Sequence, residues 1–204
     1  SLRAGRFMPV LGLRLAEHPY YVRQYVTPLS SESYGISMAY IQPKGELHVS
    51  AFAHDPWRYS SERGDGVSIY GELRPDPRLQ LGAGFRLANR DLDLTYTTVG
   101  TAKLVARDDL MLMAEVDVSN QHLSGGYKRH QVAAQLVGSW QIAAPWMLDI
   151  GVGYYNANLH ISELDRAALD ANLHWFVHSH VELVMMTRLQ TLSFGAAGPT
   201  TGLA

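Results

Sequence analysis

Apolar and polar residues alternate along most of this 204-residue chain, as they do in strands that have one apolar face. Between positions 78 and 87 every apolar side chain falls on an odd position: Leu79, Leu81, Ala83, Phe85 and Leu87. The same period of two recurs over seven further stretches, at 34–40, 47–53, 67–73, 110–118, 132–140, 148–154 and 167–175. With weaker strands at 1–7, 98–106 and 181–191, the pattern predicts an all-β chain of about eleven strands.

The predicted connections alternate in length. Short turns are expected near 43–45, 75–77, 107–109, 143–145 and 177–180, and long polar connections near 55–65, 88–97, 119–128 and 156–165. The connection over 8–32 is longer still. An antiparallel up-and-down meander with short turns at one end and long loops at the other is typical of outer-membrane β-barrels. We therefore expect a single β-barrel domain over 1–204, with a long loop at 8–32.

Alternation alone does not fix which way the apolar face points. A soluble β-barrel or β-sandwich turns it inward, whereas a membrane barrel turns it toward lipid. Strands of about nine to eleven residues match a tilted span of the bilayer. The polar positions are poor in lysine, and the middle of the apolar face is small: Ala51, Ala83, Ala114, Ala134 and Ala171. These features favour a transmembrane barrel, and the alternative is a soluble ligand-binding module with an apolar cavity.

Aromatic residues near the strand ends support the membrane barrel. Tyr40, Trp140, Trp146 and Trp175 lie close to short turns, and Tyr34 and Tyr154 lie close to long connections. Two such sets are expected where a barrel crosses the two membrane interfaces.

Composition removes several other function classes. The formal net charge of −2 argues against a nucleic-acid-binding protein, and the absence of cysteine excludes disulfides and thiolate metal sites. His178 and His180 have a spacing that suits zinc, but no third ligand lies near them in the sequence. No Gly-x-Ser-x-Gly elbow occurs. We expect no metal, no cofactor and no enzymatic activity.

The opening stretch Arg3-Ala-Gly-Arg-Phe-Met-Pro-Val-Leu-Gly-Leu-Arg14, together with the meander, resembles porin-type outer-membrane proteins of Gram-negative bacteria. The resemblance implies contact with membrane lipids in the outer membrane and passive passage of small hydrophilic solutes or ions. A homo-oligomer is compatible with it. Neither a signal peptide nor a terminal strand ending in an aromatic residue is visible, so we expect a fragment of a longer chain and an incomplete barrel.

On this interpretation the charged residues of the polar face line the pore. The candidates are Glu72, Arg74, Arg78, Arg86, Lys103, Glu115, Asp117, Asp149, Arg166, Asp170 and Arg188, joined by Glu46 and Glu182. The hairpin 67–87 is mostly basic and the stretch 110–150 mostly acidic, which predicts facing walls with a transverse field. The alternative is that these residues form cross-strand ion pairs that only hydrate and stiffen the lumen.

The connection 8–32 supplies candidates for a constriction. A long connection without structure of its own is usually functional or disordered. If it folds inward, Arg14, Glu17, His18 and Arg23 would narrow the channel, and the alternative is an ordinary external loop. Glycines on the polar face, at Gly82, Gly84, Gly151 and Gly153, are expected to be small lumen residues.

Overall fold

The computed structural model describes residues 1–13, 21–22, 33–53, 64–90, 93–123, 125–161, 164–193 and 199–203. Most of these residues form one antiparallel sheet in which each strand pairs with its neighbours in sequence. Its twelve strands are β1 (Leu2–Phe7), β2 (Ser33–Gln42), β3 (Gly45–Ala53), β4 (Asp65–Asp76), β5 (Leu79–Arg90), β6 (Asp93–Arg107), β7 (Leu110–His122), β8 (Lys128–Ala143), β9 (Trp146–Asn156), β10 (Asp165–His178), β11 (Val181–Ser193) and β12 (Pro199–Leu203). The predicted up-and-down meander is confirmed.

Two predicted long connections need correction. Residues 88–90 and 93–97 continue the β5–β6 ladder, and 119–122 continue β7, so most of the expected loop at 88–97 and part of the one at 119–128 are strand. Backbone hydrogen bonds hold a ladder together without apolar side chains, so these strands extend past the apolar band. The twelfth strand, β12, pairs with the end of β11 and was not predicted.

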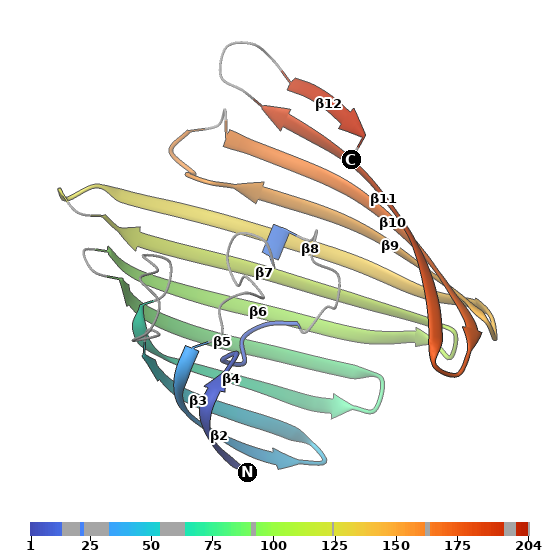
Figure 1. Ribbon diagram of the computed structural model, residues 1–204, viewed down its shortest axis with the longest axis horizontal. Coiled ribbons are helices and arrows are strands. Elements are labelled where there is room, and N and C mark those ends of the chain that lie inside the picture. Colours follow the sequence, from blue (N-terminus) through green and yellow to red (C-terminus); the bar gives the residue numbers. More distant parts are fainter. Residues whose placement is uncertain are drawn as a thin grey trace.

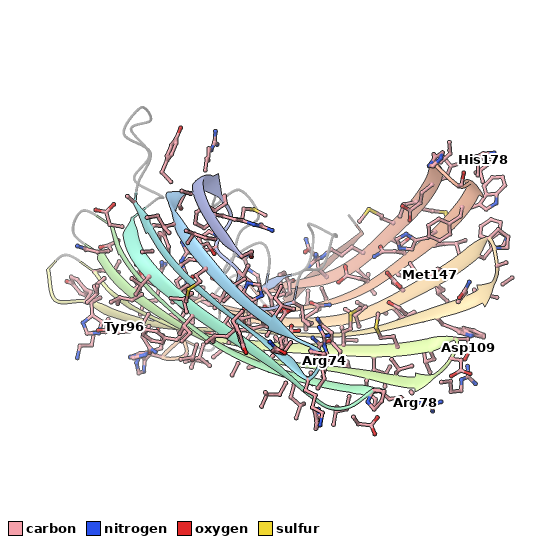
Figure 2. All side chains as sticks on the ribbon, turned by 90° about the horizontal axis from the view of Figure 1, so that it is seen from below. Arg74, Arg78, Tyr96, Asp109, Met147 and His178 are labelled. Atoms are coloured by element: carbon pink, nitrogen blue, oxygen red, sulfur yellow. The ribbon has the colours of Figure 1, made fainter. Side chains whose placement is uncertain are left out.

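The sheet is strongly curved, and it forms an open trough with one concave and one convex face (Figure 2). Within the described ranges, no ladder joins β12 to β1, and Figure 1 shows the two ends of the sheet apart. Arg78 and Asp109 mark the short-turn edge of the sheet, and Tyr96 marks the opposite edge (Figure 2). The architecture is that of an incomplete barrel, as expected.

Burial shows which face carries which side chains. Apolar side chains of the middle strands are exposed on the convex face, for example Leu136 with 49% of its surface accessible, and also Ile69 and Val152. Carboxylates on the same strands are buried, and Asp117 is fully inaccessible. The soluble alternative requires the opposite arrangement, because its apolar face would be the buried one. The predicted orientation of the two faces is therefore correct.

Aromatic side chains gather at the short-turn edge. Trp146 and Trp175, opposite each other on β9 and β10, stack with ring centroids 5.2 Å apart and planes 6° from parallel. The indole N–H of Trp140 donates a hydrogen bond to Asp109 in the turn between β6 and β7, at 3.0 Å. This arrangement matches one interfacial girdle. As for helices, none in the described ranges is both long and apolar enough to span a bilayer.

Candidate functional site

The chain leaves β1 at Phe7 and enters the concave face. We call the described residues 8–13 and 21–22 the inward segment (Figure 1). Leu11 packs against Tyr70 of β4 and Val99 of β6. Further along the trough, a second buried cluster is formed by Leu13, Tyr21, Val22, Ala133, Val137, Tyr155 and Ala168. The inward segment thus contacts strands from β4 to β11.

The segment is anchored to β7 through one carboxylate. The backbone N–H of Leu13 donates a hydrogen bond to Oε2 of Glu115 at 2.5 Å, and Glu115 is buried. The preceding residue, Gly12, has a φ of +72°, which side-chain-bearing residues rarely adopt. A Cβ at Gly12 would lie 2.3 Å from Oε1 of Glu115. The backbone conformation therefore favours glycine here, and a methyl group would have to displace the carboxylate of Glu115.

Glycines on the strands make room for the inward segment. A Cβ at Gly84 of β5 would lie 2.7 Å from the Cδ1 of Leu11, and one at Gly153 of β9 would lie 3.3 Å from the ring of Tyr21. At Gly84 and Gly153, side chains of the inward segment occupy the space that a larger residue would need.

Ion pairs on β3, β4 and β6 lie on the short-turn side of the segment. Nζ of Lys103 lies 3.3 Å from Oε1 of Glu72, which also accepts a hydrogen bond of 2.7 Å from the hydroxyl of Tyr70. Glu46 lies 3.2 Å from Nε2 of His48 and 3.9 Å from the guanidinium of Arg74.

A second group of pairs lies on β9, β10 and β11. The imidazole of His174 is 3.3 Å from Asp149 and 2.6 Å from Glu182, so it bridges three strands. Nε of Arg188 lies 3.6 Å from Asp170, and its guanidinium covers the ring of Tyr21 at 4.5 Å. Arg74, His174 and Arg188 are matched with acids on adjacent strands, which is the arrangement of the ion-pair alternative, whereas Lys103 reaches Glu72 across β5.

The remaining predicted residues take different places. Arg86 is buried on the concave face, with its guanidinium 4.9 Å from the ring of Phe52. Asp117 is buried on β7, and Arg166 is partly buried on β10. Arg78 lies in the exposed turn before β5 and pairs with Asp108 of the next short turn at 3.3 Å, so it is not part of the concave ladder. The constriction candidates Arg14, Glu17, His18 and Arg23 lie outside the described residues.

Sequence reasoning left out three side chains that organise this face: Tyr70, His174 and Tyr21. Tyr70 and His174 occupy polar-face positions of their strands, so their place in the alternation could have identified them as residues of the concave face. Tyr21 lies in the long connection, where no periodicity marks a contact. Across the described part of the chain, no group of three or more His, Asp or Glu side chains is placed to hold a metal ion.

Comparison with known proteins rests on structure alone, because no protein-family model and no curated protein sequence matches this chain. A loop L8 deletion mutant of OmpT, an outer membrane protein of Vibrio cholerae, superimposes with a TM-score of 0.70 at 11% identity over 99% of this chain and 73% of that one. The outer membrane channel DcaP of Acinetobacter baumannii gives a TM-score of 0.65 at 10% identity over 85% of this chain.

The chain has an outer-membrane β-barrel fold. It spans 60% of the length of the Acinetobacter channel, in agreement with a sheet that is not closed. At such low identity the likeness concerns the fold, and function has to be argued from the concave face itself.

Proposed function

We propose that this protein is a channel of the Gram-negative outer membrane through which small hydrophilic solutes or ions diffuse passively. The observation that carries the proposal is the burial of charged side chains on the concave face, opposite a convex face of exposed aliphatic side chains. Lipid contacts the convex face, because charged groups are costly in hydrocarbon. The concave face then surrounds a hydrated passage and involves no enzymatic step or cofactor.

The inward segment is the proposed constriction. It lies against the concave face from β4 to β11, and the buried Glu115 holds it there through the N–H of Leu13. A segment held in this way reduces the free cross-section of the lumen. Pore diameter and the polar groups along the pore then determine which solutes pass.

Charged side chains of the concave face supply the proposed local field. Arg74, Arg86 and Lys103 present positive charge, and Glu115, Asp117 and Asp149 present negative charge. The ion pairs described above neutralise part of this field locally. We therefore expect weak overall ion selectivity and a dominant effect of size.

Planar-bilayer recording with the full-length protein tests the proposal. We expect discrete conductance steps whose size scales with the salt concentration. Glu115→Gln keeps the size of the side chain but weakens the anchor of the inward segment, so its open-channel current should fluctuate more than that of the wild type. Glu182→Gln, which removes a carboxylate on β11 away from Leu13, is the matched control. Correctly assembled protein that never conducts would contradict the channel function.

A further inference from the structure

A hollow of about 450 Å³ opens on the concave face beside Leu13 of the inward segment. Its wall includes Glu46, Glu72, Arg74, Lys103, Met111 and Met113. The register places Lys103 opposite Met113, on the short-turn side of the pair formed by Thr101 and Glu115. The volume lies within the range of about 300–1,000 Å³ typical of small-molecule sites. A solute that passes the inward segment would therefore contact this wall.

The charges of the hollow sum to zero and are arranged in two layers. The carboxylates are set back, with 5% of the Glu72 side chain and 15% of the Glu46 side chain exposed. The cations stand forward, with 41% of Arg74 and 29% of Lys103 exposed. Each cation is held by one of these carboxylates, at 3.9 Å for Arg74 and 3.3 Å for Lys103.

This arrangement discriminates by dipole rather than by net charge. A singly charged ion is attracted by one pair member and repelled by the other, so the repulsion offsets part of its Coulomb energy. A solute that carries both signs aligns with the pairs, placing its carboxylate at the ammonium or guanidinium and its ammonium toward the acids. Charge-assisted hydrogen bonds of this kind are stronger than neutral ones.

The remaining wall is the polar side chain of Gln80 and an apolar side. Leu13, Met111 and Met113 line the hollow next to the ion pairs. Methionine side chains adapt their shape to irregular apolar groups. The hollow therefore offers a charged side and an adaptable apolar side within one small volume.

We propose that this hollow is a binding site for small zwitterionic solutes with an apolar side chain, that is, for free aliphatic α-amino acids. The proposal rests on the channel function above, whose substrate class it specifies. The contacts divide the solute into two parts: the α-ammonium and α-carboxylate lie at the ion pairs, and the side chain lies on the methionines and Leu13.

Current recording from the full-length channel tests the site, with four added solutes. L-leucine carries all the recognised groups, glycine lacks the side chain, 4-methylpentanoate lacks the ammonium, and 3-methylbutylamine lacks the carboxylate. We expect leucine to interrupt the ion current at concentrations about threefold to fivefold lower than each of the others, as expected for the loss of one partly solvated contact. Equal effects of the four solutes on a conducting channel would refute the site and leave the channel function intact.

Variants test the charged side and the apolar side of the hollow separately. The pair Arg74→Gln with Lys103→Gln should shift the preference toward 3-methylbutylamine, and Met113→Ala should reduce leucine to the level of glycine without changing the charge. Arg107→Gln, which removes an exposed cation at the β6–β7 turn, is the control and should behave as the wild type. Should the double variant not assemble, Met113→Ala still decides: unchanged preference for leucine over glycine overturns the proposal.

Discussion

The two faces of the same strands differ in how specific their contacts are. On the convex face, exposed side chains such as Leu136 and Val152 meet lipid in our proposal, and one aliphatic residue serves as well as another. On the concave face several side chains have a specific partner: Glu115 holds Leu13, and Glu72 holds Lys103. Changes on the convex face should therefore affect assembly, whereas changes on the concave face should affect passage.

The largest effect is expected from a charge on the convex face. Ala83→Arg or Leu136→Arg should abolish assembly, because arginine at the bilayer midplane costs about 2–4 kcal/mol on the lipid face. Heat-modifiable electrophoretic mobility of the membrane fraction measures assembly. Gln80→Arg is the control: Gln80 lies on β5 and lines the concave face together with Glu72, so this variant should assemble. If the outcomes were reversed, the assignment of the faces would be inverted.

The second-largest effect is expected from weakening the anchor of the inward segment. Gly12→Ala introduces a left-handed residue, at a cost of about 1–2 kcal/mol, and a methyl group that collides with Glu115. The segment should leave its place, and single-channel conductance should increase. Gly126→Ala, with a φ of +84° and open space around its Cβ, carries the same backbone cost without the collision. Equal conductance of the two variants would argue against a constriction at this segment.

The tryptophan stack at the short-turn edge should affect stability alone. Trp146→Leu, Trp175→Leu and the double variant form a cycle, for which we expect a coupling of about 0.5–1.5 kcal/mol in the free energy of unfolding. Guanidinium-induced unfolding in detergent micelles gives these energies. Unitary conductance should stay unchanged in all three variants, because the pair lies on the convex side of the strands. A changed conductance would contradict the claim that residues of the convex face affect stability and not passage.

Ion preference should respond least. Reversing one charge about 8 Å from a permeating ion in water changes its energy by about 1 kcal/mol, and physiological salt screens more than half of this. Arg86→Glu, on the concave face, should raise cation permeability relative to anions by about twofold in reversal-potential measurements. Arg78→Glu, in the exposed turn, should change it much less. If both variants shifted the permeability ratio by the same small amount, neither arginine would lie near the passage.

Much of the fold follows from alternation, because the side-chain period of a strand is a local property. The odd phase of Leu79, Leu81 and Phe85 placed them on one face, and the structure confirms that phase. Loop lengths were harder to predict: the polar residues from 88 to 97 resembled a loop because strand propensity was read from apolar content, whereas backbone pairing such as Asn89 with Leu94 continues beyond it.

The sequence by itself determined the class of sheet, its up-and-down order and the residues of each face, since all three depend on a period of two and on turn residues. Only the tertiary structure decided how the concave face is organised. Leu13 and Glu115 are 102 residues apart, and Arg188 meets Tyr21 from the opposite end of the chain. Such pairs arise from the curvature and register of the whole sheet. No local sequence pattern predicts these pairs, because the two partners come into contact only after the strands between them have paired.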